Sequence, residues 1–355
     1  MGEFRQNRWL NRFAIFSAVA TWFLIGLGGL VTSHEAGMAV PDWPTTYGYN
    51  MFLFPPSQWI GGIFYEHSHR LLASFVGLLT TILAIWLWLT EDRRWVRWLG
   101  VAAFLAVVLQ GVLGGLRVRL MIDQLGIFHA ALAHVFLVLL CFIALVTSRA
   151  WEPVRFTGWT VPGATVALIW IATGLIFTQL VLGASMRHQH AGLAVPDFPL
   201  AYGQLWPSTD AEFLGKINRE RIDPLEPNPI RASHIHLHMT HRLGALTALA
   251  VVASLAWRTR RSVVGTAPVR RYALGLLLLM VIQAGFGAWT VWSNKAADVA
   301  TVHVLLGATG LVAVSLTGVV AARSGVLARI GLSRAELNRT VGVKINGENL
   351  AANTL

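Results

Sequence analysis

Four histidines occupy matching positions in the two halves of this 355-residue sequence. They are His69 and His129 in the first half and His241 and His303 in the second, at offsets of 172 and 174 residues. Imidazole is a common metal ligand and a proton carrier near neutral pH. Two imidazoles from separate segments can hold a haem iron between them, so the pattern predicts two iron sites, one in each half.

An acidic residue distinguishes the two halves. Glu66 lies three residues before His69, on the same face of a helix, and the repeat has His238 at that position. A carboxylate near an apolar zone is either paired with an arginine or used for proton chemistry, and Arg70 is a candidate partner. Both interpretations stay open. The functional hypothesis is that the first half does chemistry while the second half only holds a redox centre.

Arginines follow the first histidine of each pair. Arg70 and Arg242 are expected at the outer membrane boundary, where arginine forks suit the propionates of a haem. The alternative is that both side chains extend to lipid phosphates.

Structural zinc is the competing metal, because the segment "HIHLHMTHR" carries several imidazoles. His234, His238 and His241 would share one helix face there, but no carboxylate or thiol nearby completes a tetrahedral set. Cys141 is the only cysteine, which excludes an intramolecular disulfide and a multi-thiolate site. The sequence therefore favours haem over zinc.

The elements that must position these residues are transmembrane helices. The chain is 55% hydrophobic and 13% charged, and its apolar residues gather into stretches long enough to cross about 30 Å of hydrocarbon. Eight such spans are predicted, near 13–33, 62–89, 99–116, 124–147, 161–184, 236–257, 272–292 and 299–322. The first is expected to be a retained helix rather than a cleaved signal peptide.

The net charge of +11 indicates orientation rather than nucleic-acid binding. Most of the 28 Lys and Arg residues fall in the connections that are inside when the N-terminus is inside. The positive-inside rule then predicts cytoplasmic termini and iron sites near the outer face of a bacterial plasma membrane.

A segment without helical or strand periodicity occurs twice, as "AGMAVPDWPTTYG" from residue 36 and "AGLAVPDFPLAYG" from residue 191. Its prolines exclude a regular helix and its aromatic rings need apolar cover, so it is either a structural loop or a lid. The offset of 155 residues increases to 172 across a polar insertion within 204–232. We predict an all-α membrane protein whose eight transmembrane helices form two duplicated four-helix bundles with the same topology, residues 1–150 and 151–322, followed by a basic cytoplasmic tail at 323–355.

The ordered motifs "AGMAVPDWP", "EHSHR" and "LGIFHAAL", then "AGLAVPDFP", "HMTHR" and "TVHVLLGA", resemble the haem A synthase family over nearly all of residues 10–322. The resemblance implies an oxidoreductase that converts haem O to haem A for terminal oxidases, by two hydroxylations of a porphyrin methyl and loss of water from the diol. It also implies roles for particular residues: His69 and His129 would bracket the substrate haem, Glu66 would be an essential acid, and His241 and His303 would ligate a haem b cofactor.

The sequence departs from the family in two places. Some members carry a cysteine pair in the first outer loop, and residues 34–60 contain none. Some have a further histidine where this chain has Ala73, and His67 points off that face. A thiol role is therefore absent here or is met by other groups.

Other functions remain as alternatives. A di-haem cytochrome b exchanging electrons with quinone would use the same histidines but gives Glu66 no task. A transporter would need a path to both faces, and a purely structural assembly protein would bind no haem. Membrane lipid is an expected partner, haem O synthase and oxidase assembly factors are candidates, and the electron donor and any homo-oligomer stay undetermined.

Overall fold

The computed structural model describes residues 7–152, 161–220, 228–261 and 267–329. Within them the chain is helical and contains no strand. Eight helices are long and apolar enough to cross a membrane. They are α1 (Arg8–Ser33), α2 (Gly61–Thr90), α3 (Arg94–Leu120), α4 (Leu125–Val146), α5 (Gly163–His188), α7 (Ala232–Arg261), α8 (Ala267–Trp292) and α9 (Ala297–Arg329). The all-α membrane fold class with eight spans is confirmed, as is the integral-membrane character.

Local signals extend the helices beyond the apolar stretches. The side chain of Asn7 accepts hydrogen bonds from the backbone N–H groups of Trp9 and Leu10, so α1 begins five residues before the predicted span. At the other end of α3, Met121 adopts a left-handed conformation at φ 53° and closes the last turn. Polar and basic end residues are thus helical although they are too hydrophilic to count in a hydropathy window.

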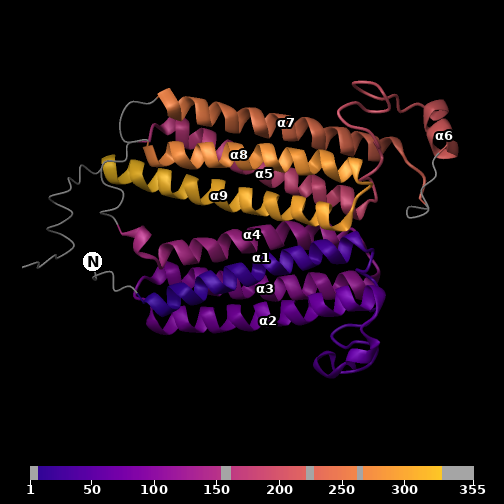
Figure 1. Cartoon of the computed structure of the whole chain (residues 1–355). Helices are drawn as coiled ribbons and strands as arrows, with labels where there is room; N and C mark the ends of the chain where they lie inside the picture. Colours follow the sequence, from indigo (N-terminus) through magenta and orange to yellow (C-terminus); the bar gives the residue numbers. More distant parts are fainter. Residues whose placement is uncertain (1–6, 153–160, 221–227, 262–266, 330–355) are drawn as a thin grey trace, which may run out of the picture.

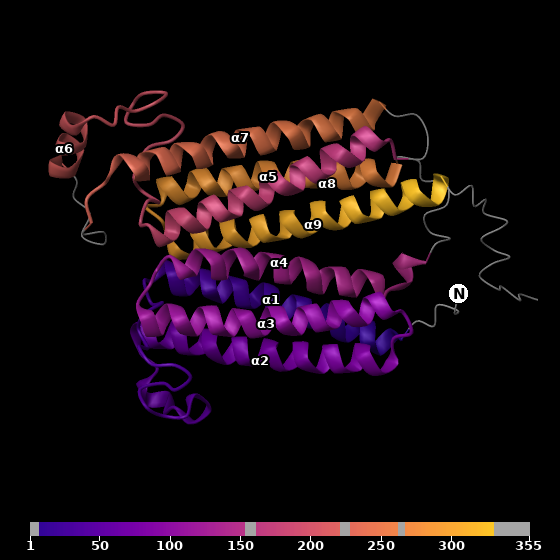
Figure 2. The ribbon, with the colours of Figure 1, turned by 180° about the vertical axis from the view of Figure 1, so that it is seen from behind.

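The helices pack as two groups of four (Figures 1 and 2). Helices α1 to α4 surround one apolar core that includes Leu83 and Leu140, and helices α5, α7, α8 and α9 surround another that includes Ile169 and Leu255. This packing is consistent with the predicted pair of bundles. Residues 330–355, most of the predicted tail, lie outside the described residues.

The two groups meet along a seam in which α1 packs on α9, and α4 packs on both α5 and α9. Gly26 and Gly29 of α1 allow the close approach, because a Cβ on either would stand 3.2 or 3.1 Å from the nearest side-chain carbon of α9. Arg187 of α5 crosses the seam, where its Nη2 donates to the carbonyl oxygen of Gly29 and the Oγ of Ser33 at 2.6 and 2.7 Å. Polar and apolar contacts therefore both join the groups.

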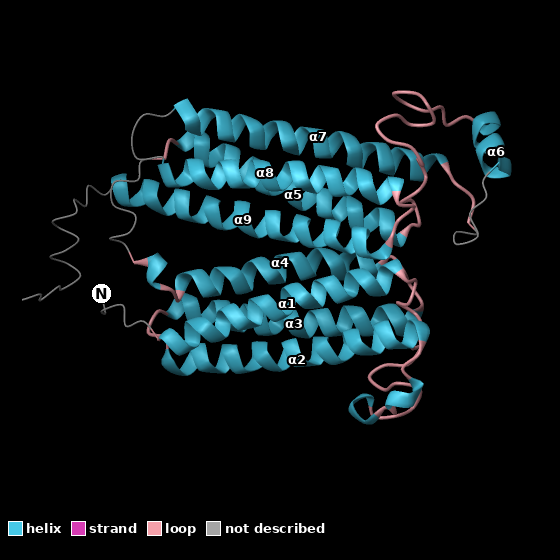
Figure 3. Ribbon diagram, viewed as in Figure 1, coloured by secondary structure: helices cyan, strands magenta, loops and turns pink. Residues whose placement is uncertain are grey.

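The irregular segments gather at one end of the helices, which we call the loop end, opposite the start of α1 and the end of α9 (Figure 3). The first long loop carries the short helices η1 (Met51–Leu53) and η2 (Pro56–Gln58), and a third short helix, η3 (Arg149–Trp151), follows α4 at the opposite end. The second loop carries α6 (Ala211–Glu220), whose first turn is capped by Asp210. The insertion was expected to be polar, and its short helix was not predicted. Residues 221–227 of the insertion lie outside the described part.

Candidate haem sites at the loop end

The four matched histidines lie in the turns of α2, α4, α7 and α9 closest to the loop end. His69 and His129 are close enough to interact electrostatically, and so are His241 and His303. The structure therefore brings together the two pairs expected from the sequence, one in each group of helices.

Most ring nitrogens of these histidines have no partner. In the described residues no hydrogen bond engages the rings of His69, His129 or His241, and the buried Nδ1 of each is unsatisfied. Only His303 differs, with its Nδ1 3.1 Å from the carbonyl oxygen of Gln283, a contact that favours a bare, ligand-ready Nε2. An unpaired buried polar group costs about 1–3 kcal/mol, so these imidazoles suit a bound metal centre.

A glycine of the preceding transmembrane helix faces each ring. A Cβ built on that glycine would stand close to the histidine Cε1, at 3.1 Å for Gly28 and His69, 3.3 Å for Gly114 and His129, 3.6 Å for Gly183 and His241, and 3.0 Å for Gly287 and His303. The glycines fix where each imidazole stands, and their positions repeat at offsets of 155 and 173 residues. The sequence analysis missed them, although the repeat alignment could have shown them.

Replacement of Gly287 by leucine is expected to lower the haem content of the purified protein at least several-fold, because the side chain would displace the ring of His303. Gly285 provides a matched control on the same helix, since a Cβ there meets nothing within 4 Å. Haem per protein, measured as the pyridine haemochrome, should be normal in Gly285→Leu. Equal haem content in both variants would contradict the positioning role of Gly287.

Glu66 is buried, with 4% of its surface exposed, and both carboxylate oxygens are occupied. Oε1 accepts from Nη2 of Arg70 at 2.6 Å, and Oε2 accepts from the backbone N–H of Val40 at 2.7 Å. The ion pair that the sequence left open is therefore present. The bond from Val40 ties the carboxylate to the first repeated loop. Glu66 itself is three residues before His69.

Arg70 and Arg242 hold the two repeated loops in the same way. Arg70 donates to the carbonyl oxygens of residues 40, 42 and 45, and Arg242 donates to those of residues 195, 197 and 200. These bonds occupy four of the five N–H groups of Arg70 once Glu66 is included. From the sequence we expected the N–H groups of both arginines to bind haem propionates. In the structure most of these N–H groups donate to loop carbonyls instead.

Each repeated loop is closed by an aspartate. Asp42 accepts from the N–H groups of Tyr47 and Gly48, and Asp197 accepts from those of Tyr202 and Gly203. Burial would raise the pKa of Asp42, but the bonds from Gly48, the Thr45 hydroxyl and Tyr47 outweigh it and lower the pKa. The contribution of this carboxylate to loop stability is thus complete at neutral pH and is lost only in strong acid, as the pH falls through the lowered pKa. The repeated motif encodes a closed loop fastened by the arginine that follows the first histidine of each pair.

Two further histidines of the first group are buried. His67 lies between Phe54 and Trp59, with its Nδ1 3.2 Å from the Oγ1 of Thr46, so it points away from His69 and under the loop. The Nδ1 of His134 lies 2.7 Å from the carbonyl oxygen of Ala130. The zinc alternative gains no support, because the described residues contain no group of three or more His, Cys, Asp or Glu side chains that could hold an ion.

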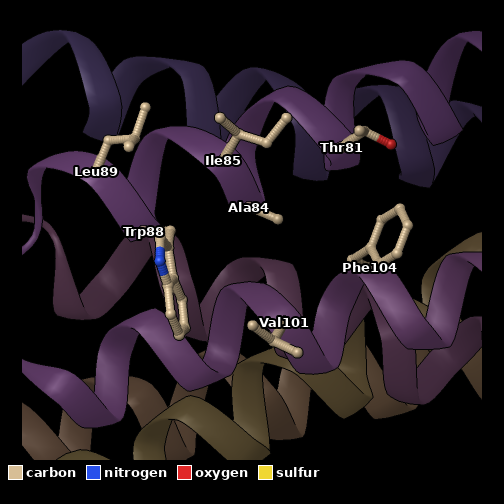
Figure 4. A pocket seen from close by; sticks show the side chains of 7 residues that line it. All are labelled: Thr81, Ala84, Ile85, Trp88, Leu89, Val101 and Phe104. Atoms are coloured by element: carbon tan, nitrogen blue, oxygen red, sulfur yellow. The ribbon is translucent and has the colours of Figure 1, made fainter.

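A hollow of about 310 Å³ between α2 and α3 lies away from the histidines (Figure 4). It is lined by apolar side chains such as Ile85, Trp88 and Phe104. Its nearest α2 residue, Thr81, is about 18 Å along the helix from His69 at about 1.5 Å per residue. Its lining carries no acid, base or metal ligand, so it contributes no chemistry to the site.

Comparison with known proteins places the whole helical region in one family. The model of the family described as cytochrome oxidase assembly protein (COX15-CtaA) matches residues 11–316, from α1 into α9. A heme A synthase of Halalkalibacterium halodurans is 27% identical over 312 residues, which cover 84% of this chain and 93% of that protein. A heme A synthase of Mesorhizobium japonicum is 27% identical over 333 residues, covering 84% and 86%. One of Symbiobacterium thermophilum is 30% identical over 273 residues, covering 74% and 78%.

Proposed function

The chain belongs to the COX15-CtaA family of cytochrome oxidase assembly proteins, and on that premise we propose that it is the membrane oxidoreductase that converts haem O to haem A. Its similarity to proteins named heme A synthase extends over most of the chain. The observation that carries the proposal is a pair of histidines in each group of helices, with a buried ring nitrogen left without a hydrogen bond in His69, His129 and His241. The di-haem cytochrome b alternative uses the same histidines but leaves Glu66 without a task.

The two groups of helices divide the work. His69 and His129 bracket the substrate haem, and His241 and His303 hold a haem b cofactor. When bound, haem b supplies one-electron redox chemistry whose potential is tuned by its imidazole ligands and their surroundings. The division is supported by Glu66, which has a carboxylate beside the first pair, where the second group has His238.

The carboxylate of Glu66 serves the removal of hydrogen from the porphyrin methyl. That step leaves an electron-deficient carbon, and an ionised carboxylate at the reacting edge stabilises the positive charge or accepts the proton. The bonds from Arg70 and Val40 favour the ionised form of the carboxylate and orient it. Each oxygen accepts one of these bonds and keeps a further lone pair, so the carboxylate can accept a proton without losing either.

Propionate binding differs between the two arginines. Arg70 keeps only its Nε–H for a haem carboxylate, because loop carbonyls and Glu66 take the rest. Arg242 keeps both its Nε–H and one Nη1–H, so it is the better placed of the two to bind a propionate, in the haem b site.

The arginine-rich connections support cytoplasmic termini, with the loop end and both haem sites at the outer face. Haem O synthase would then supply the substrate, and assembly factors of the oxidase would receive the product. Both transfers would take place in the plasma membrane.

The function is tested by expressing the chain in a bacterium that makes haem O but no haem A. Extracted haems should then include haem A, identified by its formyl group. Haem O that accumulates unchanged in cells whose purified protein carries b-type haem would instead support the cytochrome b alternative.

A further inference from the structure

One cation of the first group of helices stands where the sequence repeat has an uncharged residue. Arg117 lies in the last turn of α3 at the loop end, and the repeat has Thr290 at the corresponding position. The asymmetry falls in the same group of helices as Glu66. The family motifs of the sequence do not include this residue.

The side chain of Arg117 is enclosed but only partly bonded. It is 16% exposed, and its Nη2 donates to Oδ1 of Asp123 at 3.0 Å. Its Nε is buried and has no partner in the described residues. Arg117 therefore keeps donors available, whereas Arg70 has only one left.

The repeated loop makes room for this guanidinium. A Cβ on Gly37 would stand 2.7 and 2.8 Å from Nη1 and Nη2 of Arg117, so any other residue at position 37 would push the side chain away. The first repeated loop thus leaves space for the arginine at Gly37.

Arg117 lies near the residues proposed for the substrate site. Its charge acts on Glu66, His69 and His129, so it lies within electrostatic range of all three. Asp123, its one bonded carboxylate, is 42% exposed, and water therefore weakens that ion pair. An unsatisfied N–H beside two histidines that bracket a haem is a site for an anionic group of that haem.

We propose that Arg117 binds a propionate carboxylate of the haem held by His69 and His129, and thereby selects the substrate orientation in that site. The inference rests on the proposed function. Guanidinium forks match carboxylate geometry, and the bonds are strengthened by charge on both partners. Thr290 offers no charge, and the cation that lies against the matching glycine of the second loop, Gly192, is Lys295, which is a point charge rather than a fork.

The test compares haem O with its dimethyl ester, in which both propionates are uncharged. Each is titrated into the detergent-purified, haem b-containing protein, and the dissociation constants are measured from the absorbance change. Arg117→Gln should weaken haem O binding about 10-fold or more and leave ester binding unchanged, since a hydrogen bond between charged groups is lost only with the free acid. Arg119→Gln removes an exposed charge from the same turn and should change neither constant.

Arg117→Lys should bind haem O with an affinity between those of the wild type and Arg117→Gln, because lysine keeps the charge but not the fork. Its affinity for the ester should equal that of the wild type. Asp123→Asn should preserve the preference of the protein for the acid, since it breaks only the ion pair. Equal weakening of acid and ester in Arg117→Gln, or no weakening of either, would overturn the inference. Neither result would affect the proposed function, which fails instead if the wild-type protein does not convert haem O.

Discussion

A Glu66→Gln variant is expected to retain its b-type haem and to form haem A at least about 100-fold more slowly, accumulating haem O or its alcohol. General acid-base groups typically contribute factors of about 100 to 10,000 to a rate, and glutamine can neither accept the proton nor stabilise positive charge. Its side-chain oxygen can still accept from the N–H of Val40, so the loop keeps its bond to this position. Chromatography of extracted haems distinguishes the three compounds.

The competing explanation is that Glu66 only fastens the loop, and Arg70→Gln separates the two. That variant breaks the same ion pair and three further bonds to loop carbonyls but leaves the carboxylate in place. We expect it to lose less activity than Glu66→Gln. An equal or larger loss would assign Glu66 a structural role, and normal haem A formation by Glu66→Gln would remove it from the chemistry altogether.

His241→Ala is expected to abolish the b-type spectrum of the purified protein. His303 alone can supply only one axial ligand to the iron, and two opposed imidazoles are needed for the six-coordinate, low-spin state. The measurement is the reduced-minus-oxidised absorbance spectrum, together with haem per protein.

His236→Ala is the matched control for that variant. His236 lies on the same helix and is exposed, and its ring has one hydrogen bond among the described residues, to the hydroxyl of Thr209 at 3.4 Å. Its removal should leave the spectrum unchanged. A b-type spectrum that survives in His241→Ala would remove His241 from the ligands and with it the division of work between the two groups of helices.

The spans could be predicted from sequence because lipid demands apolar stretches of a fixed minimum length, and each stretch was found. Their ends could not, since the polar residues that cap a helix lower its hydropathy, as at Asn7 of α1. Helix α6 was missed because it is short and its residues are mostly polar, with only Ile217 buried.

The histidine pairs were found because the repeat offset singles them out. The glycines that face them were not, because Gly28 and Gly287 lie on other helices than the rings they support and only packing relates them. The hydrogen-bond partners of Arg70 also could not be predicted from the sequence, since an arginine near a carboxylate can bind that carboxylate, a lipid headgroup or a ligand equally well. Arg70 donates to three backbone carbonyls because the closed shape of the loop brings them together around its guanidinium.

The seam has the symmetry of a homodimer interface. In the repeat, α1 corresponds to α5 and α4 corresponds to α9. The packing of α1 on α9 therefore has its equivalent in the packing of α5 on α4, and the packing of α4 on α9 is its own equivalent, as expected about a twofold axis. In a dimer of identical chains every substitution appears on both sides of the axis. A single chain is free of that constraint. Arg187 bonds to α1, whereas Thr32 at the matching position bonds only within its own helix among the described residues, and Arg117 stands where the repeat has the uncharged Thr290.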